Sequence, residues 1–575
     1  MTGQRARATG RRMTAGLTAA TTAAALLAAV PAPASATPGP AGTPQAAPGT
    51  PLAVPGRPQV VPGTPRAVPG AAASPPGKPG ALVGKPNMAI GAPGGAQRRP
   101  DAAGLPSALV GGPGAAIGTA VGSSSAAVGT PGSAGIGDAY YPAAGNGGYD
   151  VFHYDAALDY AGRETGKVDA TVTITAMSTQ QLSRFDLDFR GPQVTGITVN
   201  GRPASFTRSG QELVVTPSAV IPSETKFTTV VRYSGVPGPA SDGSLGTYGW
   251  VPTKDGAVAL GEPDGTPTWL PVNDHPRDKA TYAFHVTVPS DLQVVANGTP
   301  GASTRRGAKT TYEWTETSAM ASYLATIAIG KFQIRRTKAG KVPVITAVDP
   351  KYASSARKLE RTTVAALKWE ASQFGPYPFA TAGGTIDDPR LDYALETQER
   401  PVYAGFAPDE TFVVHELAHQ WFGDAVSLHD WKDIWLNEGF ATYAEWLWAE
   451  HKGKDTTRRI FKKYYAQPAE SPVFNPPPGS PARRDLFGFS VYIRGAMCLE
   501  ALRERIGDAR FFKLVKAWAA RGWSASARKR SGTRSAKYGA ATTAGFIALA
   551  EKMSGKSLDR LFQAWLYQKG KPKKW

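Results

Sequence analysis

The sequence predicts an α+β protein with several parts: a long disordered N-terminal region, then a β-rich domain, then a mainly helical domain. Three observations lead to this order. Residues 1–148 are mostly Pro, Gly, Ala and Ser, residues 149–340 alternate apolar and polar side chains, and residues 341–575 carry apolar side chains at helical spacing. Because 575 residues exceed what one hydrophobic core usually supports, two folded domains are expected.

Residues 1–36 have the pattern of a signal peptide. Arginines within the first twelve residues precede an Ala- and Leu-rich stretch, and the small residues 34–36 form a cleavage site. The pattern predicts a secreted, extracellular protein whose mature chain starts near Thr37. The pair Arg11 and Arg12 leaves both twin-arginine export and ordinary secretion open. The apolar stretch is broken by proline, so it does not predict a membrane span.

Residues 37–148 predict a disordered tether, because they contain almost no aromatic side chains and cannot bury enough apolar surface to offset ordering. A seven-residue unit, Gly-Thr-Pro-Gln-Ala-Ala-Pro in its first copy, starts at residue 42 and is followed by three related copies. Two prolines in each copy favour an extended chain over a coiled coil. The tether is expected to act as a spacer, and contact with a cell wall is the alternative.

The β-rich domain is expected over residues 149–340. Residues 168–177, 227–233 and 281–288 alternate apolar and polar side chains, as half-buried antiparallel strands do. Asn200 and Gly201, directly after an Ile-Thr-Val run, are typical of a tight hairpin turn.

The helical domain is expected over residues 341–575. Strand material is predicted near Val344 and around Thr385. The predicted helices cover residues 354–374, 410–422, 431–448, 492–506 and 558–567.

Charge and cysteine content exclude two other classes of protein. The net charge is +19, but basic residues gather in the N-terminal region and in residues 521–537, and no nucleic-acid-binding motif accompanies them. We therefore expect no nucleic-acid partner, and we interpret the basic run as a solvated loop or a contact to an anionic surface. The single cysteine, Cys498, lies in an apolar helical pattern and is predicted to be a core residue without a disulfide.

A metal site is predicted by the pattern His-Glu-Leu-Ala-His at residues 415–419. On a helix, His415 and His419 project from the same face and can reach one ion, and imidazole nitrogens at that spacing suit zinc. A catalytic zinc needs a third protein ligand, and Glu438 is the candidate because the chain can turn and return over the eighteen intervening residues. One Zn²⁺ per chain is therefore expected.

Two further glutamates gain roles from their positions. Glu416 lies about 100° around the helix from His415, so it suits a general base that takes a proton from zinc-activated water. Glu445 lies two helical turns beyond Glu438 and shares its face, where it could orient a ligating histidine. An ordinary surface glutamate is the alternative for Glu445.

The motif His-Glu-Leu-Ala-His-Gln-Trp-Phe-Gly at residues 415–423, with Trp-Leu-Asn-Glu-Gly-Phe at 435–440, resembles the M1 family of zinc aminopeptidases. The resemblance extends from about Tyr149 to the end of the chain and points to the smaller secreted bacterial members. It implies an antiparallel β-sandwich followed by a thermolysin-like zinc peptidase domain. The segment at residues 271–280 also resembles the family and is interpreted as structural.

The resemblance also implies substrate-binding residues. The segment Tyr-Ala-Leu-Glu-Thr at residues 393–397 matches the family's Gly-Ala-Met-Glu-Asn only in its Ala and Glu, so Glu396 carries over as the ligand of the substrate's free amine. Glu262 carries over as a second amine-binding acid. Tyr492 matches the family tyrosine that donates to the oxyanion. Arg494 is expected to be solvated, with a contact to the peptide's carboxyl side as the alternative.

These residues predict a zinc-dependent aminopeptidase that acts on peptides with a free N-terminus. A zinc endopeptidase of the thermolysin type would share the metal site but would not need Glu396 or Glu262. A wall-associated protein with a vestigial peptidase domain is the third hypothesis, which the tether suggests. The ligands, the base and the tyrosine are all present, which argues against a vestigial site.

Overall fold

The computed structural model describes residues 129–242, 245–530 and 541–575. In the helix that ends at residue 530, side chains are described only as far as residue 522. The predicted signal peptide, most of the predicted tether and residues 531–537 of the basic run lie outside the described residues. No helix in the described part of the chain has both the length and the apolar character needed to cross a bilayer.

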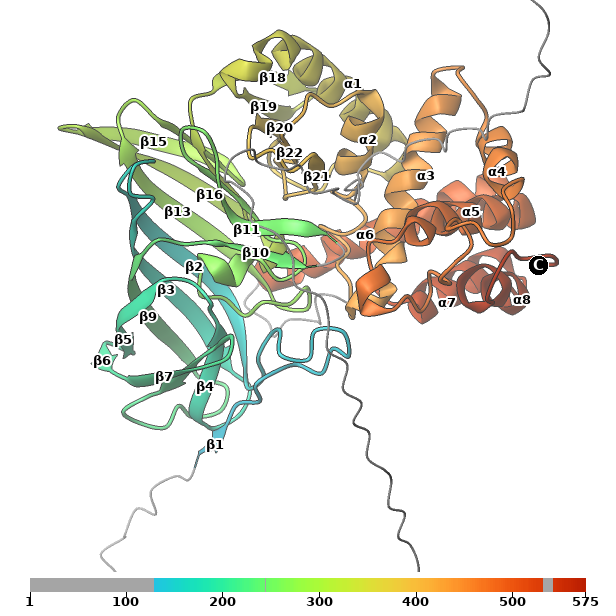
Figure 1. Cartoon of the computed structure of the whole chain (residues 1–575). Helices are drawn as coiled ribbons and strands as arrows, with labels where there is room; N and C mark the ends of the chain where they lie inside the picture. Colours follow the sequence, from blue (N-terminus) through green and yellow to red (C-terminus); the bar gives the residue numbers. More distant parts are fainter. Residues whose placement is uncertain (1–128, 243–244, 531–540) are drawn as a thin grey trace, which may run out of the picture. The chain divides into compact units, whose positions relative to one another are not determined.

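Within the described residues the first domain has seventeen strands in three sheets, as the alternating pattern predicted. An eight-stranded sheet has the order β15-β16-β13-β2-β3-β9-β5-β6, a four-stranded sheet the order β1-β4-β8-β7, and a five-stranded sheet the order β10-β11-β12-β17-β14 (Figure 1). The strands are β1 (Thr130–Pro131), β2 (Tyr149–Tyr160), β3 (Val168–Ser178), β4 (Leu182–Asp188), β5 (Gln193–Val199), β6 (Arg202–Pro203), β7 (Ser205–Ser209), β8 (Glu212–Thr216), β9 (Lys226–Gly235), β10 (Pro239–Asp242), β11 (Gly246–Pro252), β12 (Ala257–Leu260), β13 (Lys279–Pro289), β14 (Gln293–Ala296), β15 (Thr299–Arg306), β16 (Lys309–Ala321) and β17 (Ile327–Gly330).

The three predicted runs form β3, β9 and β13. In β3 every second residue, beginning with Val168, is buried, so the alternation in the sequence places one face of the strand in the core. Asn200 and Gly201 have positive φ angles of 50° and 76° and connect β5 to β6, which confirms the predicted hairpin turn. The parallel pairing of β2 with β13 is the exception to an otherwise antiparallel eight-stranded sheet.

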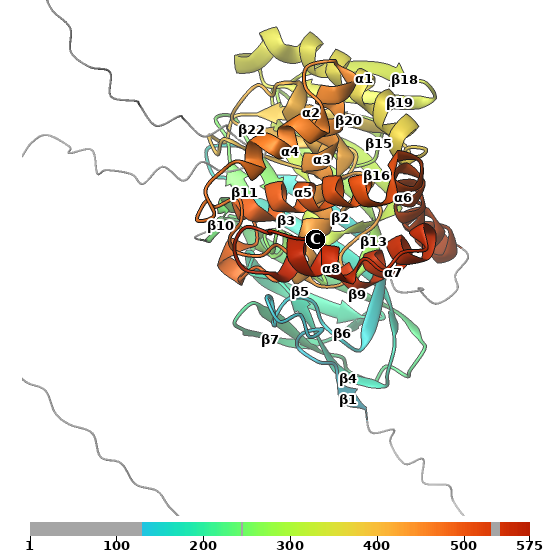
Figure 2. The same cartoon turned by 90° about the vertical axis from the view of Figure 1, so that its right-hand side faces the viewer.

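The second domain combines a mixed five-stranded sheet, in the order β18-β19-β20-β22-β21, with several helices. Figure 2 views the molecule from the side on which these helices lie. Its strands are β18 (Gln333–Ala339), β19 (Val342–Val348), β20 (Ala382–Asp387), β21 (Tyr393–Leu395) and β22 (Val402–Ala404). Its helices are α1 (Ala356–Phe374), α2 (Glu410–Ala418), α3 (Trp435–His451), α4 (Thr457–Tyr465), α5 (Phe489–Ile506), α6 (Asp508–Arg530), α7 (Thr543–Ser554) and α8 (Asp559–Phe562), which a π-helical turn (Gln563–Tyr567) continues.

The predicted helices and strands of this domain are present, but α4, α6 and α7 were not predicted. Helix α4 is amphipathic but only nine residues long, and it buries only Thr457 and Phe461. The domain boundary expected at residue 340 falls in the turn between β18 and β19, which pair with each other in one sheet. An alternating pattern does not reveal which of two successive sheets a strand joins.

Residues 129–148, expected to belong to the tether, are part of the folded structure. Within them we call residues 136–147 the strap. The Asp138 carboxylate accepts hydrogen bonds from His275 Nε2 (3.1 Å) in the first domain and from the Trp431 backbone N–H (2.8 Å) in the second. The Tyr140 hydroxyl donates to the Pro481 carbonyl. These few polar and aromatic contacts join the two domains. The Pro- and Gly-rich composition of the segment gave no indication of them.

We predict that Asp138→Asn removes a component of acid sensitivity. Burial raises the pKa of Asp138, but hydrogen bonds from His275 and from the Trp431 and Tyr140 amides outweigh it and lower the pKa from 3.8 to about 2. The ionised Asp138 carboxylate therefore contributes about 2 kcal/mol to the free energy of unfolding. This contribution is complete above pH 4 and is lost as the pH falls towards 2. Denaturant unfolding of wild type and variant between pH 2 and 7 should show a difference that shrinks across this window.

The matched control is Asp159→Asn, which removes an exposed carboxylate that pairs with Lys309. It should leave the acid dependence of the unfolding free energy as in the wild type. A constant difference between Asp138→Asn and wild type from pH 7 to pH 2 would contradict the prediction.

Candidate active site

The first side chains of the site come from α2 and the turn after it. Asp409 caps the helix by accepting from the backbone N–H groups of Thr411 and Phe412. The helix was expected to reach residue 422 but ends at Ala418, and Gly423, with φ 134°, turns the chain towards α3.

Helix α3 supplies the third predicted ligand and lies in the middle of the domain. Every residue from 435 to 448 is buried, so the helix packs on all sides. A Cβ added at Gly439 would lie 3.0 Å from the Gly495 backbone of α5, closer than an ordinary van der Waals contact, so glycine suits this close crossing. The crossing brings Glu438, next to Gly439, and Tyr492, one turn before Gly495, to the same cavity.

The structure brings His415, His419 and Glu438 together. Glu438 Oε2 lies 3.3 Å from His415 Nε2 and 3.5 Å from His419 Nε2. One ligand atom from each residue lies within 4.8 Å of the other two, and all three side chains are buried. Two imidazole nitrogens and one carboxylate oxygen form a donor set that fits the Zn²⁺ expected from the sequence.

The outer nitrogens of both histidines are held by other groups. His415 Nδ1 lies 2.6 Å from Glu445 Oε1, and His419 Nδ1 lies 3.2 Å from the Phe422 carbonyl oxygen. Because Nδ1 donates to these oxygens, each Nε2 is left facing Glu438 with a free lone pair. Glu445 is thus buried against a histidine and is not a surface glutamate.

The two predicted amine-binding acids line the same cavity as the metal site, although one comes from each domain. Glu262 follows β12 and Glu396 follows β21. Glu262, Glu396 and Glu438 each offer an oxygen within 4.8 Å of the others. The Oε1 atoms of Glu262 and Glu396 are buried and accept no hydrogen bond in the described structure. A buried carboxylate without a donor is costly, so this corner of the cavity favours a cation.

Electrostatics separate the roles of these acids. Burial raises the pKa of Glu438, but His419 and His415 outweigh it and lower the pKa to about 2. Burial raises the pKa of Glu416 to about 8 although both histidines oppose it. Burial and the charge of Glu396 raise the pKa of Glu262 well above its ordinary value. The cavity therefore holds more acidic groups than its two imidazoles offset, and without a further cation burial favours the neutral form of Glu262 and Glu416.

Apolar side chains complete the lining of the cavity. Its lining consists of Leu245, Glu262, Tyr393, Ala394, Leu395, Glu396, His415, Glu416, His419, Glu438, Phe487 and Tyr492. Sequence reasoning missed Leu245 and Phe487, which lie in loops without a motif. Tyr393 replaces the glycine of the resembled motif, and its hydroxyl donates to the Thr247 carbonyl of β11 (2.9 Å). The ring of Tyr492 stacks on that of His415 at 5.9 Å between centroids.

Two other predicted residues have structural roles. Arg494 was expected to be solvated, but the structure shows otherwise. It is fully buried and donates to the Trp565 carbonyl (2.7 Å) and the Ala564 carbonyl (2.9 Å). Its sequence offered no sign of these partners, because they lie about seventy residues away. Lys279, in the segment interpreted as structural, donates to the backbone carbonyl of Asp424 in the turn after α2.

Family models match both domains. Residues 152–324 match the peptidase M1 N-terminal domain, and residues 408–565 match the peptidase family M1 domain. Among curated proteins, a probable aminopeptidase 2 of Sulfurisphaera tokodaii is 28% identical over 53% of this chain and 40% of its own length. A leucyl aminopeptidase of Saccharolobus solfataricus is 26% identical over 63% of this chain and 48% of its own length. The chain thus spans less than half the length of these relatives.

Solved structures match over a larger share. The crystal structure of an M1 zinc metallopeptidase from Deinococcus radiodurans has a TM-score of 0.68 and 29% identity, over 76% of this chain and 99% of the other. A mutant of the Deinococcus radiodurans M1 zinc metallopeptidase bound to a Tyr-Ser-Ala substrate has a TM-score of 0.65 and 28% identity, over 76% and 99%.

We predict that Glu445→Gln weakens zinc binding by roughly 10- to 100-fold, because the neutral amide polarises and orients His415 less strongly. The affinity is measured by competition with a chelator of known zinc affinity. Glu450→Gln, on the same helix but paired with Arg503, is the matched control and should bind zinc as the wild type does. Equal affinities for all three proteins would show that Glu445 does not support the metal.

Proposed function

The chain belongs to peptidase family M1 and carries the zinc site of that family, and from this premise we propose that it is an aminopeptidase. It removes single residues from the amino terminus of peptides. One observation carries the proposal: two buried carboxylates, Glu262 and Glu396, lie beside the triad His415, His419 and Glu438, and one oxygen of each accepts no hydrogen bond in the described structure.

The distance between the acids and the triad supports exopeptidase over endopeptidase action. An aminopeptidase must place negative charge one residue away from the cleaved bond, where the free ammonium group lies. Glu396 shares a 4.8 Å cluster both with Glu438 and with Glu416 and His419, so the charge lies next to the metal ligands. A chain that continued past this point would cover the two carboxylates without neutralising them.

The side chains of the cavity have separate tasks in hydrolysis. Zinc, when bound, lowers the pKa of water and polarises the peptide carbonyl. Glu416 in its ionised form accepts the proton of the attacking water and passes it to the leaving amine. Burial raises its pKa to about 8, and the positive charge of a bound metal ion would favour the ionised form. Tyr492 stays protonated, because burial raises the pKa of its phenol well above the ordinary value, and it donates to the developing oxyanion.

The relatives agree with this chemistry as far as their names go. Both curated relatives are called aminopeptidases, one of them leucyl, and the Deinococcus mutant was crystallised with a tripeptide. Peptides with a free N-terminus are therefore the proposed substrates.

The test uses a panel of aminoacyl p-nitroanilides with free and with acetylated amines. We expect turnover of the free compounds alone, loss of activity with a chelator, and its return with zinc. Glu396→Gln should lower kcat/KM for free substrates roughly 100-fold, because it removes one partner of a buried charge pair. Glu360→Gln, a carboxylate paired with Arg335 outside the cavity, is the matched control. Comparable hydrolysis of acetylated substrates would instead favour an endopeptidase.

We also propose that the protein is exported and acts outside the cell, with the residues after the signal peptide spacing the enzyme from a surface such as the cell wall. The support is the pattern of residues 1–36 and the proline-rich repeats that follow. Expression in a secreting host should give a mature protein whose first residue, by N-terminal sequencing, lies near Thr37. An intact Met1 on protein that stays inside the cell would refute the proposal.

A further inference from the structure

The loop that carries Glu396 is held from several sides. Residues 396–400 connect β21 to β22, and all five are buried. Glu399 has a positive φ of 64°, which is strained for a residue with a side chain. Such a backbone persists only where surrounding contacts fix it, so the groups that bind the loop determine where the Glu396 carboxylate lies.

One amide side chain binds both ends of this loop. Gln420, fully buried in the turn after α2, donates from Nε2 to the Glu396 carbonyl oxygen (3.0 Å). Its Oε1 accepts from the Glu399 backbone N–H (2.7 Å). Gln420 directly follows the metal ligand His419, so a single residue connects the metal-binding turn to the amine-binding loop.

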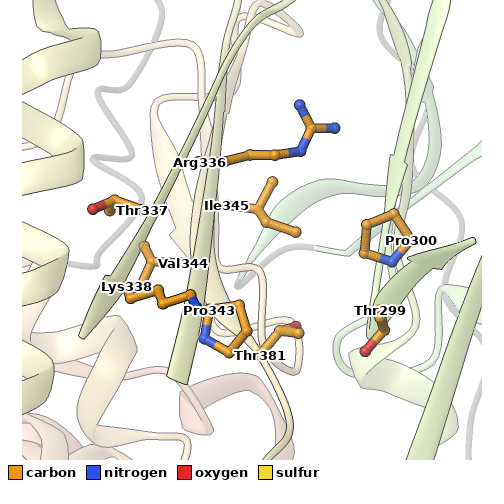
Figure 3. A pocket seen from close by; sticks show the side chains of 9 residues that line it. All are labelled: Thr299, Pro300, Arg336, Thr337, Lys338, Pro343, Val344, Ile345 and Thr381. Carbon is orange, nitrogen blue, oxygen red and sulfur yellow. The ribbon is translucent and has the colours of Figure 1, made fainter. Parts of the chain in front are cut away.

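The far side of the loop is anchored in a different place. The Glu399 carboxylate accepts from the Ala380 N–H (2.9 Å) and from the backbone and hydroxyl of Thr381. Arg400 donates to the Gly298 carbonyl of the first domain (2.6 Å). Figure 3 shows Thr381 between Pro343 and Thr299. These residues line a second pocket, and none of its lining residues lines the cavity of the metal site. These contacts fix the loop to the scaffold, and only Gln420 fixes it to the metal-binding turn among the contacts described.

We infer that Gln420 is a positioning residue that sets the spacing between the amine-binding Glu396 and the metal site. This inference rests on the proposed aminopeptidase function. The Gln420 amide fixes the Glu396 backbone at hydrogen-bond distance from the turn that holds His419. Its loss lets the loop move away from the metal without removing a ligand, so binding of the substrate's ammonium group weakens while metal binding is retained.

The experiment compares Gln420→Met with wild type, because methionine has a similar volume but makes neither hydrogen bond. Two inhibitors separate the sites: leucine hydroxamate binds through its metal-chelating group and its ammonium, whereas acetohydroxamate has only the chelating group. We expect the Ki of leucine hydroxamate to rise about 10-fold or more, with the Ki of acetohydroxamate and the zinc content unchanged. KM for free aminoacyl substrates should rise more than kcat falls.

Two further variants keep the result interpretable. Gln293→Met removes an amide that accepts from the Phe332 N–H (2.8 Å) in the first domain, so it reproduces a merely structural loss and should leave both Ki values unchanged. If Gln420→Met does not fold, Gln420→Glu carries the test, since its carboxylate still accepts from Glu399 but cannot donate to Glu396.

An unchanged Ki for leucine hydroxamate would overturn the inference, and so would a parallel rise in both Ki values or a loss of zinc. The failure of the underlying function looks different. It would appear in the wild-type enzyme itself, as an absence of turnover on substrates with a free amine.

Discussion

The structure depends on a cluster of buried acidic groups that the protein's own cations do not balance. Glu262, Glu396, Glu416 and Glu438 line one cavity, together with the imidazoles of His415 and His419 and the phenol of Tyr492. In a low-dielectric interior such carboxylates repel one another strongly, and burial raises the pKa of most of them. A divalent metal ion and the ammonium group of a peptide offset this charge. The fold thus keeps the acids together in the absence of the ligands that balance them.

The packing around the cavity supplies the rigidity that this requires. The glycine contact between α3 and α5 lets the two helices cross closely, and it sets Glu438 opposite Tyr492. The first domain contributes Glu262, and it also reaches the turn after α2 through Lys279. Residues with no part in the chemistry therefore decide the distances within the site. A shift of one domain against the other would change the position of Glu262 relative to the metal ligands.

The sequence predicts the local features of the fold and the site well. Strand alternation, the turn at Asn200 and the spacing of His415 and His419 depend on neighbours within a few residues, and the structure shows each of them. Glu262 and Glu396 were assigned only through resemblance, since nothing in their own surroundings marks them. The contacts of Gln420, Arg494 and Phe487 depend on the three-dimensional arrangement of distant segments. Residues 129–148 were assigned to the tether because glycine and proline dominate their composition. In the structure a few polar groups nevertheless bind this segment to the two domains.

The strap has a consequence for the order in which the chain folds. Its bond from the Trp431 amide to Asp138 joins residues 293 positions apart, and the bond from Tyr140 to Pro481 spans 341. Contacts of such separation close very large loops, and chain entropy delays them until shorter-range structure exists. Although the strap is synthesised before either domain, its docking surface is complete only after the segments preceding α3 and α5 are in place. The strap is therefore expected to dock late in folding, after the two domains have formed.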